Sequence, residues 1–421
     1  MRDVMHGIMR DVMPSVMHNS MHSVMRGSMR SVIRSLISAR SILILGLAVL
    51  AEGSPVLAEE VSPGATAKAD SGLPSPSAIK VCSSHARAAE CLDKLFREAL
   101  KTHSTREVLQ TVARFEAEDA ELRRECHPVV HAIGRETFRL KGTIHDSFAA
   151  CDETCHSGCY HGSVERFLLG DDVYAQPGRH PSQSGLKQKA ASACDPKIPF
   201  RLRFQCLHGL GHAVMFFADY ELSQALAVCD ALPDDWSQTS CYGGVFMENV
   251  VNSTNEKKNF RATDYHYPCN QLANGYRGEC YKMQTTRMKE MGLSTEGLIA
   301  ECAKAGAFSI ECTQSIGRDL SNTARLGEPR AAAAGCERAE AEPRLACMRG
   351  VVYALIDNTW DGRYAFPFCA TFKSDHDRDV CLSEGIEYMK SLFEKSAADV
   401  LKDCKSYAVD LRRCAQLAAA K

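Results

Sequence analysis

The sequence lacks several patterns that mark common functional classes. Its formal net charge is −2, so no basic field is available for nucleic acid. No glycine loop of the phosphate-binding type and no nucleophile elbow is present, which argues against nucleotide-binding and serine-hydrolase folds. Alternating β-branched runs are absent as well, which argues against a sheet. The chain is therefore expected to be all-α, and its function must come from other residues.

No apolar run is long enough for a comfortable transmembrane helix. The longest one, residues 42–51 (ILILGLAVLA), follows the basic residues Arg30, Arg34 and Arg40 and precedes the small residues that end at Ala58. A basic segment, a short apolar segment and a small-residue site are typical of a secretory signal peptide. We expect cleavage near Ala58, a secreted or periplasmic location, and no membrane association afterwards. An uncleaved signal anchor is the alternative.

Three segments precede or begin the folded part. Residues 1–58 form a leader, in which methionine recurs every fourth residue up to Met29, followed by the signal peptide. The methionines are interpreted as a tandem repeat upstream of the true start; a soft-metal tract that binds copper is the alternative. Residues 59–80 are rich in Pro, Ser, Gly and Ala and are expected to be a flexible linker. Residues 81–421 are expected to form the folded domain.

The most unusual feature is the content of 20 cysteines. In an exported chain such a content indicates disulfides. Most cysteines fall into pairs that enclose a short segment. The expected pairs are Cys82–Cys91, Cys151–Cys159, Cys194–Cys206, Cys229–Cys241, Cys269–Cys280, Cys302–Cys312, Cys336–Cys347, Cys369–Cys381 and Cys404–Cys414.

The second cysteines of these pairs, together with Cys126, recur at steps of 32 to 39 residues. One longer step, from Cys159 to Cys206, contains an insertion at residues 171–189. A period of about 34 residues is typical of helix-pair repeats. Each pair is flanked by apolar-periodic runs, so each disulfide is expected to join the end of one helix to the start of the next. Such a short bridge contributes about 3 kcal/mol in a chain-entropy estimate. The pattern predicts a right-handed α/α solenoid of about ten disulfide-stapled helix pairs.

In period and cysteine placement, residues 81–420 resemble secreted, cysteine-rich proteins of the tetratricopeptide type, which carry one disulfide per helical hairpin. The Trp, Gly, Tyr and Pro pattern of ordinary tetratricopeptide units is not found. The resemblance therefore implies an architecture and no functional residue.

Two cysteines, Cys126 and Cys155, do not fit the pairing. The favoured interpretation is a Cys126–Cys155 disulfide that links neighbouring repeats; a metal, a haem or a reactive thiol is the alternative. The haem alternative rests on Cys151, Cys155 and His156, which spell C-x-x-x-C-H. That spacing is one residue longer than the usual c-type attachment motif.

The segment 126–212 contains a cluster of metal-ligand residue types. Its candidate ligands are His127, His131, His161, Glu165, His208 and His212. They form three pairs with a four-residue step, which places the two members of each pair on one face of a helix. The later repeats have no such cluster at the equivalent positions, for example Gln314/Arg318 and Arg349/Tyr353. This contrast within one chain is the main argument for a site.

Repeat register aligns His161 with His208 and Glu165 with His212. Because neighbouring helix axes lie about 8–10 Å apart, we expect one site at a seam, or two sites that share His161 and Glu165. One metal ion is not expected to reach both outer helices unless the superhelix curves tightly. Glycines between the ligand positions, such as Gly162, indicate close approach of a backbone or ligand.

The leading hypothesis is an exported helical-repeat protein that binds zinc, iron, manganese or copper through this cluster. If a coordination position stays open, the protein could be a metal-dependent enzyme, with Glu165 as ligand or general base. A non-catalytic scaffold for a protein or peptide partner on the solenoid surface is the first alternative. A c-type haem protein is the second.

Overall fold

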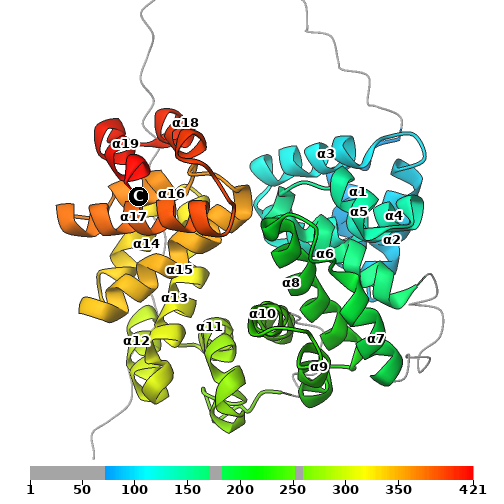
Figure 1. Cartoon of the computed structure of the whole chain (residues 1–421), viewed down its shortest axis with the longest axis horizontal. Helices are drawn as coiled ribbons and strands as arrows, with labels where there is room; N and C mark the ends of the chain where they lie inside the picture. The colour runs from blue at the N-terminus through cyan, green and yellow to red at the C-terminus, as the bar shows by residue number, and fades with distance from the viewer. Residues whose placement is uncertain (1–71, 171–182, 252–258, 421) are drawn as a thin grey trace, which may run out of the picture. The chain divides into compact units, whose positions relative to one another are not determined.

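The computed structural model describes residues 72–170, 183–251 and 259–420 (Figure 1). Within these ranges the regular elements are helical, apart from an isolated β-bridge between Arg261 and Asp264. The leader, the signal peptide and residues 59–71 of the expected linker lie outside the described residues. The all-α prediction is confirmed for the part that is described.

The helices begin and end as follows. They are α1 (Pro76–Ser83), α2 (Ala88–Ala99), α3 (Thr105–Glu118), α4 (Ala120–Lys141), α5 (Ile144–Ala150), α6 (Thr154–Leu169), α7 (Gln183–Ala193), α8 (Phe200–Phe217), α9 (Leu222–Cys229), α10 (Asp235–Val251), η1 (Cys269–Gln271), α11 (Asn274–Glu290), α12 (Thr295–Cys302), η2 (Ala303–Phe308), α13 (Ser309–Arg325), α14 (Pro329–Cys336), α15 (Ala341–Thr359), α16 (Ala365–Ala370), α17 (Asp375–Ser391), α18 (Ala397–Tyr407) and α19 (Leu411–Ala419).

Local sequence explains many helix ends. Ser104 caps α3 in a capping box with Glu107, and Ser396 caps α18 in the same way with Asp399. Such boxes satisfy two of the backbone amides that a helix start leaves without partners. At the other end of α4, Gly142 adopts a left-handed conformation with φ of 77°, which terminates the helix at little steric cost.

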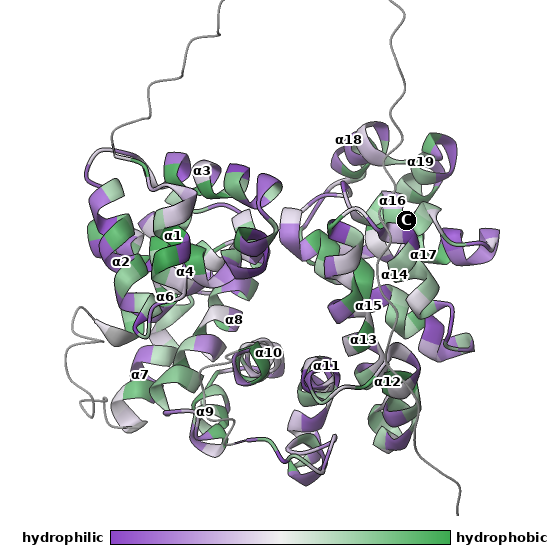
Figure 2. Ribbon diagram, turned by 180° about the vertical axis from the view of Figure 1, so that it is seen from behind, coloured by the Kyte–Doolittle hydropathy of each residue, from purple (hydrophilic) through white to green (hydrophobic). Residues whose placement is uncertain are grey.

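The long helices α4, α6, α8, α10, α11, α13, α15 and α17 pack in chain order, each against the next. Shorter elements lie between them in the chain, and disulfides join most of these to the long helix that follows (Figure 1). One continuous apolar core runs from Ile79 to Ala418. Figure 2 shows apolar residues along packed helices such as α13 and α15. The dense helix packing is what positions the site described below.

Ten disulfides are present, and they join the same cysteines that the sequence pairs. Nine close short segments; the tenth, Cys126–Cys155, joins α4 to α6. No cysteine is free in the described residues. Ten disulfides indicate an oxidising, extracellular environment.

Three pairs of neighbouring helices, α4/α6, α8/α10 and α13/α15, cross through the same backbone contact. On each helix of a pair, a glycine faces the carbonyl oxygen of a residue on the partner helix. A Cβ added at any of these glycines would lie only 1.9 to 2.1 Å from that oxygen. The glycines and the carbonyls that they face are Gly134 and Cys159, Gly162 and His131, Gly211 and Cys241, Gly244 and His208, Gly317 and Cys347, and Gly350 and Gln314.

The late helices also contact the early ones. α15 packs against α6, and Tyr160 stacks on Trp360 with 5.7 Å between ring centroids. Arg325 of α13 forms an ion pair with Glu116 of α3. α15 therefore lies against α6, which carries His161, and α13 reaches α3 through Arg325. Across the described helices, none combines the length and apolar character needed to span a membrane.

Two expected boundaries shift. α1 begins at Pro76, so the last residues of the expected linker 59–80 are helical and the folded domain begins before residue 81. Pro76 suits a first helical turn, where its missing N–H has no intrahelical partner. The end of the expected insertion 171–189 belongs to α7, which begins at Gln183; residues 171–182 lie outside the described part.

Candidate metal centre

Five imidazole rings from three helices meet in one cluster. His127 and His131 lie on α4, His161 on α6, and His208 and His212 on α8. Ring centroids of His161 lie 5.3 to 5.4 Å from those of the other four. The rings of His127 and His212, from the two outer helices, are 6.0 Å apart. Rings of the outer helices α4 and α8 therefore lie close together, but the three rings whose ligand atoms lie within 4.8 Å of one another come from the neighbouring helices α4 and α6.

Glycine explains why the three helices come so close. The Cα of His161 lies 2.8 Å from the position of a Cβ on Gly209, so α6 and α8 also meet nearly backbone to backbone. Gly162 makes the corresponding approach of α6 to α4, against His131. Glycine at such a contact lets two helix backbones approach more closely than a larger residue would. The expected close approach at glycine is confirmed.

Glu165 lies behind His131. Its Oε1 is 2.7 Å from Nδ1 of His131, and its Oε2 accepts a hydrogen bond of 2.6 Å from Arg135. Burial alone would raise the pKa of Glu165, but His131 and Arg135 outweigh it and hold that pKa well below its usual range. An ionised carboxylate only accepts hydrogen bonds, so His131 donates from Nδ1. The lone pair of His131 is then on Nε2, and both Glu165 oxygens are engaged.

A buried charge network continues from Arg135 away from the histidines. Asp93 accepts hydrogen bonds from Arg135 at 2.9 Å and from Arg166 at 2.8 Å, and Arg166 also contacts Glu136 at 3.1 Å. Asp93 and Glu136 are at most 2% exposed. Such a network orients the carboxylate that orients His131, as outer partners of metal ligands commonly do.

His127 is oriented by a strained turn at the start of α6. Its Nδ1 donates to the carbonyl of Cys155 at 2.8 Å, so its lone pair is on Nε2. Cys155, His156 and Ser157 are three successive non-glycine residues with φ of 52°, 57° and 61°. The left-handed conformation costs about 1–2 kcal/mol per residue and persists only where surrounding contacts impose it. The disulfide from Cys155 to Cys126, next to His127, is one such contact.

His212 repeats the carboxylate arrangement of His131 on the next helix pair. Its Nδ1 lies 2.9 Å from Oε2 of Glu248, and Tyr220 donates to the other oxygen of Glu248 at 2.9 Å. The Nε2 of His212 is buried and has no hydrogen-bond partner. Sequence reasoning missed Glu248, although it follows His212 by 36 residues, much as Glu165 follows His131 by 34. The sequence signal that could have identified Glu248 is a carboxylate about one repeat after the histidine, as in the pair His131 and Glu165.

His161 and His208 complete the cluster. The Nε2 of His161 lies 3.1 Å from Oε1 of Gln205, a second residue that sequence reasoning missed, and its Nδ1 is buried without a partner. His208 is hydrogen-bonded to the backbone of Ser240. Since an amide oxygen accepts, His161 donates from Nε2 and keeps its lone pair on Nδ1.

Three of the histidines meet the distance requirement for one ion. His127, His131 and His161 each offer a ring nitrogen, and these atoms all lie within 4.8 Å of one another. The Nε2 atoms of His127 and His131 are 3.0 Å apart. Both are the lone-pair atoms of their rings, so the two lone pairs face each other. Neutral imidazole is the form that binds a metal ion.

Protonation is disfavoured within the cluster. Burial, together with the neighbouring histidines, lowers the pKa of His127, His161 and His208 well below the ordinary value. On the side facing α13, burial and then Arg325 and Arg318 lower the pKa of His156 to about 3. Protonation of a ring is therefore an unfavourable way to remove the repulsion between the facing lone pairs of His127 and His131.

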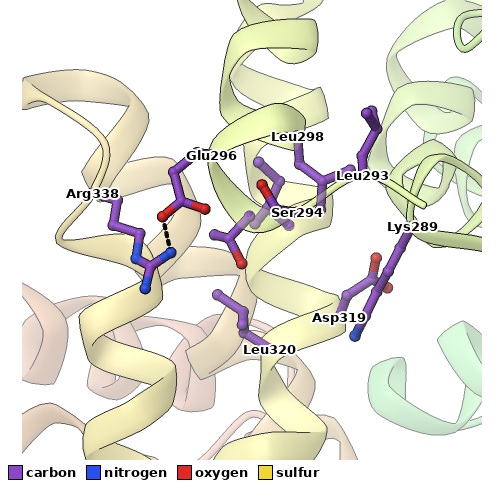
Figure 3. Close-up of a pocket in the computed structure, with 10 residues that line it drawn as sticks. Lys289, Leu293, Ser294, Glu296, Leu298, Asp319, Leu320 and Arg338 are labelled. Atoms are coloured by element: carbon purple, nitrogen blue, oxygen red, sulfur yellow. Dashed lines mark hydrogen bonds and ion pairs between the residues drawn. The ribbon is translucent and has the colours of Figure 1, made fainter. Parts of the chain in front are cut away.

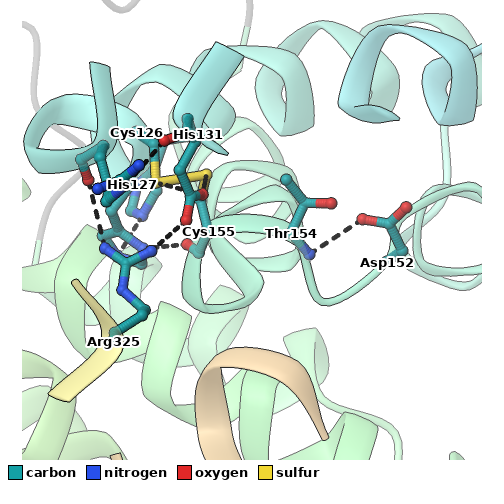
Figure 4. Close-up of a disulfide and its surroundings, with 9 residues drawn as sticks. Cys126, His127, His131, Asp152, Thr154, Cys155 and Arg325 are labelled. Carbon is teal, nitrogen blue, oxygen red and sulfur yellow. Dashed lines mark hydrogen bonds and ion pairs between the residues drawn. A yellow bond between two sulfur atoms is a disulfide. The ribbon is translucent and has the colours of Figure 1, made fainter. Parts of the chain in front are cut away.

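The disulfide Cys126–Cys155 lies beside His127, and Figure 4 shows Arg325 directed toward it from α13. Glu116, Cys126 and Cys155 also lie close enough to hold an ion, but both sulfurs are bonded to each other. Cys151 is bonded to Cys159 in the same way. A c-type haem needs thioether bonds to free sulfurs, so the haem alternative on Cys151, Cys155 and His156 is withdrawn.

The helix contacts agree with the alignment of His161 with His208. Gly162 lies against His131, Gly209 against His161 and Gly244 against His208, so these three histidines occupy equivalent positions on successive helices. The correspondence of His131 with the other two was not predicted, because His131 is not at the same distance from its cysteine.

Comparison of the chain with protein-family models, curated proteins and solved structures gives no match, so the candidate site is defined by its own geometry.

Proposed function

We propose that this protein binds one divalent transition metal ion, zinc in the first place, through His127, His131 and His161. The facing Nε2 lone pairs of His127 and His131, 3.0 Å apart, carry the proposal. Two nitrogens bound to one tetrahedral zinc at about 2.0–2.1 Å lie about 3.3 Å apart, close to this separation. A cation bound between the two nitrogens would replace the repulsion of their lone pairs by two coordinate bonds.

The outer contacts support the same assignment. His131 donates its Nδ1 hydrogen to Glu165, and His127 donates its Nδ1 hydrogen to the Cys155 carbonyl. The lone pair of each ring, on Nε2, therefore points into the cluster. Carboxylate and carbonyl partners of this kind fix the ring and tautomer of metal-ligating histidines. Glu165 is accordingly reassigned from ligand to orienting residue. An all-imidazole set suits zinc, copper or iron better than manganese, which prefers oxygen ligands.

Elemental analysis of the mature chain, exported into an oxidising compartment and dialysed, tests this proposal. We expect about one zinc ion per chain, lost in His161→Ala and retained in His145→Ala. His145 is a matched control because its side chain is 81% exposed and outside the cluster. A folded, metal-free wild-type protein would contradict the proposal.

Export is part of the proposal. The ten disulfides support a secreted or periplasmic location, reached after cleavage near Ala58. The amino-terminal sequence of the exported protein should then begin at Glu59. The architecture that we propose is a right-handed α/α solenoid of about ten helix pairs; the packing of the long helices in chain order supports a helical-repeat arrangement.

A second candidate function is a scaffold for a protein or peptide partner. It is favoured by a surface pocket between α11, α12 and α13, remote in sequence from the histidines (Figure 3). Lys289, Glu296 and Arg338 give it charge, and Leu293 and Leu320 give it apolar surface. If the protein is only a scaffold, chelation will change neither its melting temperature nor its partner binding.

A further inference from the structure

Four of the five clustered rings have one nitrogen engaged by an acceptor outside the cluster and one nitrogen left over. His212 shares this arrangement with the three histidines of the proposed site. The acceptors are the Cys155 carbonyl for His127, Glu165 for His131, Gln205 for His161 and Glu248 for His212. Each ring donates to its acceptor, so its other nitrogen carries a lone pair.

None of these four lone pairs has a hydrogen-bond donor in the described residues. The Nδ1 of His161 and the Nε2 of His212 are buried and have no hydrogen-bond partner. The Nε2 atoms of His127 and His131 face each other at 3.0 Å, and both carry lone pairs. Burying an acceptor without a donor is unfavourable. One cation at the centre of the four rings would satisfy all four lone pairs.

The four rings are also spaced as ligands of one tetrahedral ion. A ring bound to zinc at about 2.0–2.1 Å has its centroid about 3.2 Å from the ion, so tetrahedral geometry separates two such centroids by about 5.2 Å. The six centroid separations among the four rings run from 4.5 to 6.0 Å.

His212 has the two longest of these separations, 5.7 and 6.0 Å, to the rings of α4. It therefore lies outside the set of three whose ligand atoms are all within 4.8 Å of one another. To reach the tetrahedral spacing, His212 must approach α4 by less than about 1 Å when the ion binds.

His208, the fifth ring, lacks the arrangement that the other four share. It is hydrogen-bonded to the backbone of Ser240, and in the described residues neither of its ring nitrogens is both buried and without a partner. Its ring contacts those of His161 and His212, at 5.4 and 5.1 Å, but no ring contact within the described residues joins it to α4. We therefore do not expect His208 to bind the ion.

A ligand on α8 would add a cross-link that the disulfides do not provide. Cys126–Cys155 joins α4 to α6, whereas Cys194–Cys206 joins α8 to the residue that follows α7. None of the ten disulfides joins α8 to α4 or α6. An ion bound by His212 and by the rings of α4 and α6 would hold the three helices together.

We propose that His212, oriented by Glu248, is the fourth ligand, and that the site is a closed structural zinc centre that ties α8 to α4 and α6. This inference rests on the proposed zinc site. Structural zinc sites have four protein ligands, whereas catalytic sites keep one position open for water or substrate. The inference thus assigns the metal a role in stability.

The first test compares two histidines of the same helix, His212→Ala and His208→Ala, in the full mature protein. Competition with a chromophoric chelator measures zinc affinity, and circular dichroism checks that each variant is folded. We expect His212→Ala to weaken zinc binding at least 100-fold and Glu248→Gln to weaken it about 10–100-fold. His208→Ala should stay within about threefold of wild type.

The second test needs no variant and asks whether a coordination position is open. Cobalt(II) replaces zinc, because the visible spectrum of cobalt reports its coordination geometry. We expect added azide to leave the spectrum of the cobalt-loaded wild type unchanged, since a closed site offers the anion no position. In His212→Ala, loaded at high cobalt concentration, azide should shift the spectrum.

Two results would overturn the inference. Wild-type zinc affinity in folded His212→Ala would remove His212 from the ligands, and an azide-dependent spectrum in the wild type would show an open site. Both results leave the three-histidine site standing. A folded wild type that takes up neither zinc nor cobalt contradicts the proposed metal site itself, so the two failures are distinguishable.

Discussion

The pairs α4/α6 and α13/α15 cross through the same glycine–carbonyl contact but differ in what they place there. Where α4 has His131, α13 has Gln314; where α6 has His161, α15 has Arg349. Arg349 is hydrogen-bonded to Glu384 of α17 at 2.6 and 3.0 Å. The late pair thus shows that this crossing needs no histidine. The histidines of the early pair are additions to a scaffold, which is why we interpret them functionally.

The largest expected effect breaks the feature that the two pairs share. Gly162→Ala and Gly350→Ala each direct a Cβ against a backbone oxygen, at 1.9 and 2.0 Å. The helices must separate, so we expect each change to lower the free energy of unfolding by more than about 3 kcal/mol. Urea denaturation of the oxidised proteins measures this. Gly162→Ala should also lose zinc binding; Gly350→Ala should keep it while folded.

The matched control is Gly275→Ala on α11. A Cβ at Gly275 meets nothing within 4 Å, and alanine is a better helix former than glycine. This change should leave stability unchanged or raise it by up to about 1 kcal/mol. Equal destabilisation by all three changes would contradict the crossing argument.

The second expected effect distinguishes the α4/α6 pair from the α13/α15 pair by its affinity for zinc. His131→Ala should weaken zinc binding at least 100-fold, since even changes in outer partners of ligands cost 10–100-fold. Gln314→Ala, at the corresponding position of α13, should leave zinc affinity unchanged. Competition with a chromophoric chelator measures both constants. Equal zinc affinities in the two variants would mean that the cluster is not the site.

A smaller effect is expected from the carboxylates. Glu165→Gln keeps the shape of the side chain but weakens its hold on His131, so zinc affinity should fall about 10–100-fold. The late counterpart is Glu384→Gln. Glu384 accepts hydrogen bonds from Arg349 and Tyr353, away from the histidine cluster, so this change should have no effect on zinc. The same chelator competition applies, and a wild-type affinity for Glu165→Gln would contradict its orienting role.

The smallest effect concerns pH in the metal-free protein. His127, His161 and His208 have a lowered pKa when folded, so the unfolded chain binds more protons below about pH 6.5. Their contribution to stability is present above that pH and is lost as pH falls, by up to about 1.4 kcal/mol per pH unit for each histidine. Hydrogen exchange at pH 5.5 should show α4, α6 and α8 opening before α13 and α15. Uniform opening would contradict this difference.

Much of the fold was readable because cysteine spacing and helix periodicity are local signals. Pairs such as Cys229–Cys241 lie within one hairpin, so their partners follow from the sequence. The pair Cys126–Cys155 was favoured because free thiols are uncommon in exported proteins, and the structure confirms it. The start of α1 was missed because Pro76 and its polar neighbours also suit a linker.

The residues of the candidate site could be predicted from the sequence, but their arrangement in space could not. The i,i+4 pairs identified the histidines, and glycine between them indicated close approach. The grouping of five rings depends on how closely Gly162 and Gly209 bring three helices together, a distance that no local pattern encodes. Glu165 was expected to be a ligand or a general base because the contact of Arg135 with its second oxygen is not visible in the sequence. Glu248 was missed because it lies on the next long helix, outside the four-residue spacing that identified the histidines.

Zinc K-edge X-ray absorption on the zinc-loaded mature protein would show directly which atoms bind the ion. We expect a first shell of four imidazole nitrogens at about 2.0–2.1 Å, with outer-shell imidazole scattering that decreases in His161→Ala. A shell that contains sulfur, a shell of carboxylate oxygens, or failure of the folded protein to take up zinc would contradict it.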